Sequence, residues 1–241
     1  SATASQNVAD IVTSATGAAT ATAVTTQGQA GATDTVVATN YTGATDFNSM
    51  NSTGNVNFTA LAAGQKAGIV GNGSVINGDV GVGYAATVTA GAINVSGGTT
   101  RGTITETGAG ITSNTINSTG AANVLTNVVL SGTANTALTI NAATNLTTGN
   151  ITGFTGTTSK ITVAGAAASV NIGTLENTTV KTVDAAGLTA GGVTATLNTN
   201  TGIVFTGGAG NDVVTAGAVL VTGASVDAGA GTADRRYSSF A

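Results

Sequence analysis

A nine-residue segment near the end of the chain has the composition of a calcium-binding loop. Residues 207–215 read GGAGNDVVT and match the pattern G-G-x-G-x-D-x-U-x, where U is aliphatic, at every fixed position. Ca²⁺ takes about six to eight oxygen ligands, and glycines let main-chain carbonyls turn toward the ion while an aspartate supplies charge. The segment therefore predicts a calcium site whose ligands come from Gly207, Gly208, Gly210, Asn211 and Asp212.

A second, degenerate copy of this loop follows in the sequence. Residues 228–234 read AGAGTAD, with the aspartate one position late. The interval from Gly208 to Gly229 matches the spacing at which aliphatic residues recur in this part of the chain. If that spacing is one coil of the chain, the two loops stack at one corner and share an ion, with Asp227 and Asp234 as further ligands. A metal-free interpretation is also open, in which the loop is a glycine-rich corner capped by an aspartate.

Aliphatic residues recur at nearly constant spacing from the middle of the chain onward. Each is followed by a small or polar residue and then, within a few positions, by Gly or Ala. The period of about 20–23 residues is typical of solenoids, in which each coil buries its inner face only by stacking on the next. The repeat anchors are Ile93, Ile116, Leu138, Ile161, Val183, Ile203 and Val226.

The segments around these anchors alternate with a period of two and are rich in Thr and Val, which favours strands. Gly-containing pairs supply the turns, and the chain has no Pro to interrupt a strand ladder. We expect an all-β parallel β-solenoid, similar to a β-helix or β-roll, with about 20–23 residues per coil, roughly eleven coils and stacked Asn and Thr ladders. The expected division is a flexible or helical arm at 1–30, the solenoid body at 31–206, and the calcium-binding turn and tail at 207–241.

The composition excludes several classes of function. The chain has no His and no Cys, which excludes histidine-based acid–base catalysis, thiolate nucleophiles and the usual zinc sites. Only 6 of the 241 residues are Lys or Arg and the net charge is −4, which argues against nucleic-acid binding. No apolar run reaches the length of a transmembrane helix, so we expect no membrane insertion.

The acidic residues leave one catalytic alternative. Asp184, Asp212, Asp227 and Asp234 lie in the last third of the chain, and paired carboxylates hydrolyse glycosides in some enzymes. The cationic and aromatic groups that such a site needs for its substrate are few and widely spaced, so we expect no enzyme. Glu106 is expected to be a solvated strand or turn residue.

The segment 201–212, TGIVFTGGAGND, resembles bacterial surface-layer (S-layer) proteins of the RTX type, and so does the Thr-, Ala-, Gly-, Val- and Asn-rich body from residue 50 onward. The resemblance implies β-solenoid segments that tile into a lattice outside the cell, and assembly that is driven by Ca²⁺. It also implies type I secretion with an uncleaved C-terminal signal. Members of the family lack Cys, as this chain does.

These observations predict a secreted structural protein that self-assembles into an extracellular S-layer lattice or filament at the bacterial cell surface. The expected partners are further copies of the chain and a cell-surface polysaccharide, and Ca²⁺ is the expected cofactor if the loop binds metal. The alternative is a monomeric adhesin or ice-binding stalk segment of a larger secreted protein. Threonine pairs such as Thr103 and Thr105 are the feature that suggests ice binding.

Overall fold

The computed structural model describes residues 22–175, 179–197, 202–216 and 223–238. The described residues form three parallel β-sheets, and the helical structure among them is one 3₁₀ turn, η1 (Ala38–Asn40). Sheet A has ten strands, which in spatial order are β1 (Thr22–Thr26), β3 (Ala44–Met50), β5 (Lys66–Val70), β7 (Ala90–Ser96), β9 (Ser113–Thr119), β12 (Ala137–Ala142), β15 (Ser159–Gly165), β17 (Val180–Leu188), β19 (Val204–Thr206) and β21 (Ser225–Asp227).

Sheets B and C have six strands each. Sheet B consists of β2 (Thr33–Val37), β4 (Asn55–Leu61), β6 (Val80–Tyr84), β8 (Thr103–Thr107), β11 (Asn127–Leu130) and β14 (Asn150–Thr152). Sheet C consists of β10 (Asn123–Val124), β13 (Leu146–Thr147), β16 (Ser169–Thr174), β18 (Gly192–Leu197), β20 (Val213–Ala216) and β22 (Arg235–Ser238).

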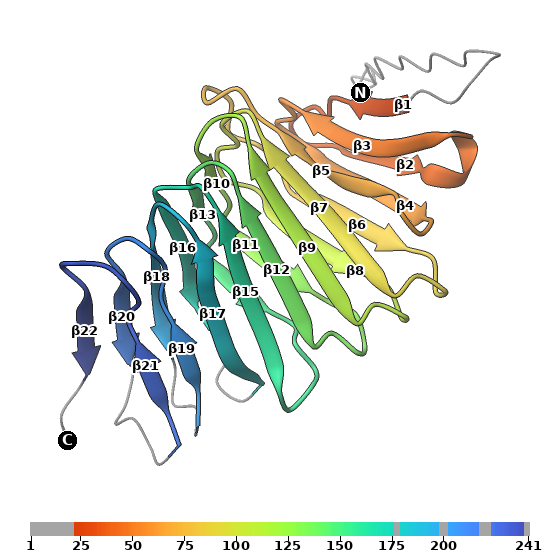
Figure 1. The fold of residues 1–241 in the computed structure, drawn as a ribbon. Coiled ribbons are helices and arrows are strands. Elements are labelled where there is room, and N and C mark those ends of the chain that lie inside the picture. Colours follow the sequence, from red (N-terminus) through yellow and green to blue (C-terminus); the bar gives the residue numbers. More distant parts are fainter. Residues whose placement is uncertain (1–21, 176–178, 198–201, 217–222, 239–241) are drawn as a thin grey trace.

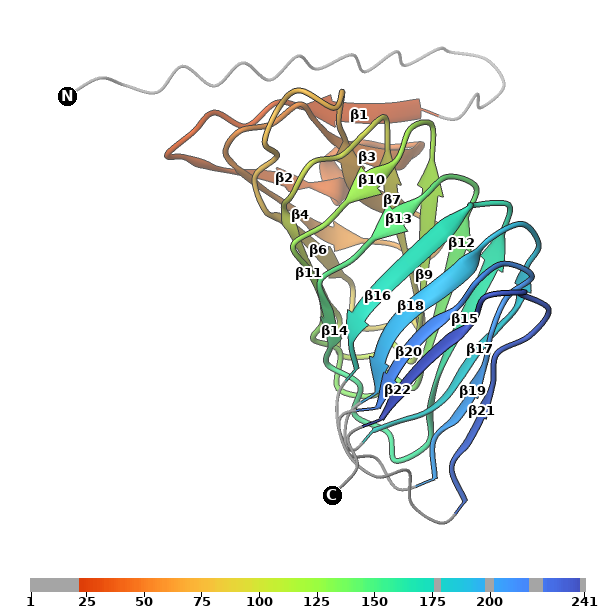
Figure 2. The ribbon, with the colours of Figure 1, turned by 90° about the vertical axis from the view of Figure 1, so that its left-hand side faces the viewer.

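The sheets wind around one axis as a β-solenoid, which confirms the fold expected from the sequence. Each strand pairs in parallel with the strand of its sheet one coil away, giving about nine coils. Figure 1 shows the strands of sheet A side by side from β1 to β21, and Figure 2 shows the strands of sheets B and C on the other sides. The coils from β9 to β14 contribute to all three sheets, whereas earlier coils lack a strand of sheet C and later coils a strand of sheet B.

The core is a set of aliphatic columns, one side chain per coil, because every second side chain of each strand points inward. In sheet A one column runs through Phe47, Ala67, Ile93, Ile116 and Ile140, all of which are buried. The coils differ in length along this column. Ala67 pairs with Ile93 and Ile93 pairs with Ile116, so the coil from β5 to β7 is longer than the coil from β7 to β9. Coil length is therefore more variable than the anchor spacing predicted.

Six of the seven repeat anchors fall into two columns, so the equal spacing misassigned part of the register. Leu138 aligns with Asn114, whereas the partner of Ile116 is Ile140, because the coil between them is longer than the anchor spacing implied. The second column runs from Leu138 through Ile161, Val183 and Phe205 to Val226. Ile203 lies just before β19, and Phe205 takes its place in the column. Six of the anchors are buried, and Val226 is half-buried.

The solenoid extends beyond the expected body at both ends. Strand β1 lies within the segment 1–30 that was expected to be an arm, and it pairs along its length with β3. Strands β20, β21 and β22 continue the same coils through the segment expected to be a separate calcium-binding unit. The reason is that strand pairing with a neighbouring coil needs only backbone groups, which a chain without Pro supplies at every residue. Residues 1–21 lie outside the described residues.

Candidate functional site

The glycine-rich loop lies at the corner between sheets A and C, where β19 ends and β20 begins. Its glycines are required by close packing of successive corners: a Cβ on Gly210 would lie 2.6 Å from the carbonyl carbon of Gly191 in the preceding coil. A Cβ on Gly207 would lie 2.5 Å from the carbonyl oxygen of Ala228 in the following coil. Larger residues at these positions would therefore separate the coils.

Asp212 is fully buried at this corner, and both of its carboxylate oxygens accept hydrogen bonds from the backbone. The amide of Val193 donates to Oδ1 at 2.6 Å and the amide of Gly208 donates to Oδ2 at 3.1 Å. Burial raises the pKa of Asp212, the two amide hydrogen bonds oppose this increase, and the charge of Asp234 adds to it. The side chain thus ties the corner of one coil to the strand of the coil before it.

Three further residues of the predicted calcium set also accept hydrogen bonds from backbone amides: Asn211, Asp227 and Asp234. The degenerate loop does stack on the intact one, because the amide of Asp212 donates to Oδ1 of Asp234 at 2.9 Å and the amide of Ala233 donates to Oδ1 of Asn211 at 3.0 Å. Asp227 accepts the amide of Gly229 at 3.0 Å within its own turn. The structure therefore brings the two loops together through carboxylate and amide oxygens that face backbone donors.

The hydrogen bonds at this corner satisfy these oxygens without an ion. Each carboxylate oxygen of Asp212 accepts one backbone N–H group, which uses about two of the four lone-pair sites of the carboxylate. Across the described ranges, no three acidic side chains come together as a metal site. The second interpretation of the sequence, a glycine-rich corner capped by aspartate, describes the observed geometry of the loop.

The corner role of Asp212 makes a testable prediction. Asp212→Ala removes the acceptor of two buried amides and is expected to lower the free energy of unfolding by about 2 kcal/mol. Urea denaturation in the presence of a chelator measures this change. The matched control Asp227→Ala removes an exposed acceptor and should change stability by less than about 0.5 kcal/mol. A loss for Asp212→Ala that occurs only when calcium is present would instead identify the aspartate as a metal ligand.

Buried asparagine corners are the feature that sequence reasoning missed. Asn123 begins sheet C, is almost fully buried, and its Oδ1 accepts the amides of Gly98 and Thr99 at 3.2 and 2.9 Å. The column that starts at Asn123 continues through Leu146, Val170 and Val193, whose amide bonds to Asp212. Asn123 and Asp212 therefore hold backbone amides at opposite ends of one aliphatic column. The sequence around Asn123 contains no motif that marks it.

The prediction for Glu106 was wrong. Its side chain is fully buried inside the solenoid, where Nδ2 of Asn114 donates to Oε2 at 3.3 Å. Glu106 follows the buried Ile104 by two positions, so strand alternation from Ile104 already indicated an inward side chain. Desolvation raises the pKa of Glu106 to about 7, against the opposing hydrogen bonds from Asn135 and Asn114.

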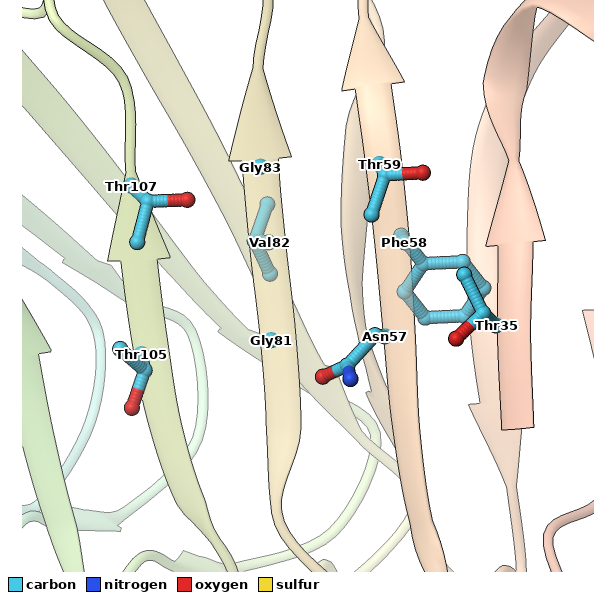
Figure 3. Close-up of a pocket in the computed structure, with 9 residues that line it drawn as sticks. All are labelled: Thr35, Asn57, Phe58, Thr59, Gly81, Val82, Gly83, Thr105 and Thr107. Atoms are coloured by element: carbon cyan, nitrogen blue, oxygen red, sulfur yellow. The ribbon is translucent and has the colours of Figure 1, made fainter. Parts of the chain in front are cut away.

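A shallow groove lies on the outer surface of sheet B. Gly81 and Gly83 of β6 leave a trench about 250 Å³ in volume, with Thr105 and Thr107 on one side and Asn57 among the residues on the other (Figure 3). Figure 3 shows hydroxyl and amide groups along both rims and no charged group among the labelled side chains. The groove offers hydrogen bonds to a neutral ligand.

Comparison with protein-family models, curated proteins and solved structures gives no match to this chain. Within the described residues, no helix has the length and apolar character needed to cross a membrane.

Proposed function

We propose that this protein is a secreted structural protein whose solenoids associate side by side into an S-layer lattice or filament at the cell surface. The observation that carries the proposal is the outer face of sheet A. Ten strands spaced by about 4.8 Å give a face about 43 Å long. Small, neutral polar side chains cover much of this face, and a second copy of the chain can approach it closely.

Rows of identical side chains make this face regular. Asn94, Asn117 and Asn141 form a ladder in which each Nδ2 donates to the Oδ1 of the preceding asparagine, at 3.0 and 3.1 Å. This ladder confirms the stacked Asn residues expected from the sequence. A parallel row in register places Thr139 between Thr115 and Thr162. Side chains that are fixed in rows lose little conformational entropy when a partner covers them.

Ion pairs on the face reduce the charge that a partner would meet. Lys66 lies 3.1 Å from Asp46 on the neighbouring strand, and Lys160 lies 2.9 Å from Asp184. The Lys160 ammonium, as a hydrogen-bond donor, lowers the pKa of Asp184 despite some opposing desolvation. Each pair joins neighbouring coils of sheet A. Charges that are paired within one copy do not repel the next copy.

The proposal assigns no catalytic role to the chain. The carboxylates that suggested glycoside chemistry have structural partners: Asp184 pairs with Lys160, and Asp212 accepts two backbone amides. A glycosidase needs two carboxyl groups that flank an open substrate site. The observed contacts support a structural role for these residues.

Two further parts of the proposal concern partners. We assign the cell-surface polysaccharide to the groove over Gly81 and Gly83, because its rims carry hydroxyl and amide groups that suit sugar hydroxyls.

Calcium dependence rests on the resemblance of residues 201–212 to RTX-type S-layer proteins, and it stays a hypothesis that a chelator tests. The alternative of an ice-binding or adhesin stalk is favoured by the Thr115, Thr139 and Thr162 row.

Sedimentation velocity of the full chain tests assembly through sheet A. The wild-type protein is expected to form large species at micromolar concentration. Thr139→Lys places an unpaired charge at the centre of the face, where the side chain is half-exposed, and should reduce the assembled fraction at least about tenfold with an unchanged circular dichroism spectrum. The matched variant Thr105→Lys, on the outer face of sheet B, should assemble like wild type. A wild-type protein that stays monomeric would favour the stalk alternative.

A further inference from the structure

An unpaired acid lies in the interior of the solenoid, in the middle of the aliphatic columns. Glu106 on β8 occupies an inward position, aligned with Val82 of β6 on one side and Leu130 of β11 on the other. Its side chain is fully buried, as is that of Asn135, and Asn114 is almost fully buried. The described residues form no salt bridge with Glu106. A buried carboxylate without a cation is strongly disfavoured relative to the neutral acid.

The hydrogen bonds around Glu106 define which of its oxygens acts as the carbonyl. Oε2 accepts the Nδ2 groups of Asn114 and Asn135, at 3.3 and 3.4 Å. Nδ2 of Asn114 also donates to Oδ1 of Asn135 at 2.9 Å. Both contacts of Asn114 Nδ2 are to oxygens, so the orientation of this amide is determined by its surroundings. Oε2 is therefore the acceptor end of the carboxyl group.

Two oxygens in this cluster have no hydrogen-bond partner, and they belong to the same two groups. They are Oε1 of Glu106 and Oδ1 of Asn114, both inaccessible to solvent. Nδ2 of Asn114 already bonds to Oε2, so the carboxyl and the amide that carry these two oxygens are hydrogen-bonded to each other. A proton on Oε1 supplies the missing donor for Oδ1, and one proton satisfies both orphan atoms.

We propose that the folded solenoid holds Glu106 as the neutral acid, which donates its proton to Oδ1 of Asn114, so that the cluster is an interior proton-binding site. Ionisation of Glu106 would leave a buried charge, and it would leave both Oε1 and Oδ1 of Asn114 without a donor. The stability of the central coils is thereby coupled to pH. This inference concerns the fold alone and does not depend on assembly.

Glycines make room for the cluster on the surrounding elements. A Cβ on Gly91 of β7 would collide with Oδ1 of Asn114, and a Cβ on Gly132 would lie 2.6 Å from Nδ2 of Asn135. A Cβ on Gly108, next to β8, would lie 3.5 Å from Oε1 of Glu106. Small residues on three neighbouring segments thus leave space for three polar side chains.

Tyr84 is the titratable group that faces Glu106 from the packed elements. It lies on β6, its hydroxyl donates to the carbonyl of Ala92 at 2.8 Å, and its own pKa is raised to about 12, chiefly by burial. The sequences of β7, β9 and β11 contain no titratable residue, and the remaining residues of β8 are Thr and Ile. Tyr84 therefore stays neutral through the pH range in which Glu106 titrates.

The sign of the pH effect follows from the raised pKa. Desolvation by burial moves the pKa of Glu106 from 4.5 to about 7. Between these two values the folded state binds a proton that the unfolded chain has released. The stability that Glu106 contributes to the fold is therefore complete below pH 4.5 and is lost as pH rises through about 7. The chain has no His, so few other side chains titrate in this window.

Thermal unfolding of the full chain at pH 5 and pH 8.5 tests the coupling. The Tm of the wild type is expected to fall by roughly 5–10 °C between these values. Glu106→Gln replaces the acid by an amide that donates to Asn114 and accepts from it at any pH. This variant should lose the pH dependence and match the wild type at pH 5. Asp212, whose pKa burial also raises, is present in both proteins, so its contribution cancels in the comparison. Equal pH dependence in both proteins would overturn the proposal.

Carbon NMR gives a second readout in which Glu106 itself is left unchanged. The chain contains two glutamates, at positions 106 and 176, so labelling of the glutamate carboxyl carbon gives two signals. The signal that remains in Glu176→Gln belongs to Glu106, and its midpoint is expected near 7. A midpoint near the ordinary value of 4.5 would show an ionised, hydrated carboxylate and would contradict the proposal.

Discussion

Replacement of Asn123 by alanine is expected to lower the free energy of unfolding by about 4 kcal/mol. Asn123 is almost fully buried, and its Oδ1 is the acceptor for the amides of Gly98 and Thr99, which belong to the preceding coil. Its Nδ2 donates to the carbonyls of Val95 and Thr119, and to the Ser118 hydroxyl at 3.0 Å. Alanine leaves this whole group of buried donors and acceptors without partners.

A matched substitution separates burial from hydrogen bonding. Asn145 also accepts two backbone amides at a corner of the solenoid. Its Oδ1 bonds to the amides of Ala168 and Ser169 of the following coil at 3.0 and 3.1 Å, but its side chain is exposed. Water replaces the lost acceptor there, so Asn145→Ala should cost about 1 kcal/mol or less. Urea unfolding of the two variants measures the difference. Equal losses would mean that the corner of Asn123 is open to water and that the interior is not sealed.

Replacement of Phe47 by alanine should have a similarly large effect, about 4 kcal/mol of unfolding free energy. Phe47 is fully buried, and its ring centre lies 6.0 Å from that of Phe58 on the opposite sheet. In the next coil its column contains Ala67, so a large residue sits beside a small one. The neighbouring side chain is too short to fill the cavity that alanine would leave.

The controls for Phe47 test whether volume or shape determines the loss. Phe47→Leu keeps most of the volume and should cost about 1 kcal/mol. Met50→Ala, on the same strand but with a side chain that is 39% exposed, should change stability by no more than about 0.5 kcal/mol. Chemical denaturation of all three variants gives the comparison. A small loss for Phe47→Ala would mean that sheets A and B are not packed through this column.

The spacing of aliphatic residues was sufficient to predict the solenoid, but it did not define the register. The fold depends on the repeated burial of one stripe per coil, and this appears in sequence as a regular period. Register depends on the length of each coil, which varies along the solenoid. The partner of Ile116 is therefore Ile140, although the nearly constant spacing pointed to Leu138.

The candidate site, like the register, was predicted only in part from the sequence. The motif pointed to Asp212 as the acid of a glycine-rich corner, but not to its burial. Its oxygens accept backbone amides of Val193 and Gly208, and the strand of Val193 is not part of the local pattern. Asn123 was missed because the amides that it accepts belong to the preceding coil. Glu106 could have been placed from its parity with Ile104, yet its partners Asn114 and Asn135 come from later segments. Long-range partners are what a single sequence does not reveal.

Negative-stain electron microscopy of the purified chain, across a Ca²⁺ titration with a chelator control, tests the central claim most directly. The proposal predicts ordered sheets or fibres for the wild type that are absent for Thr139→Lys and present for Thr105→Lys. Arrays that disappear with the chelator would assign calcium a role in assembly, and arrays that persist would leave residues 207–212 as a structural corner. Wild-type protein without ordered arrays at any calcium concentration would contradict the proposal that this solenoid is a self-assembling structural protein.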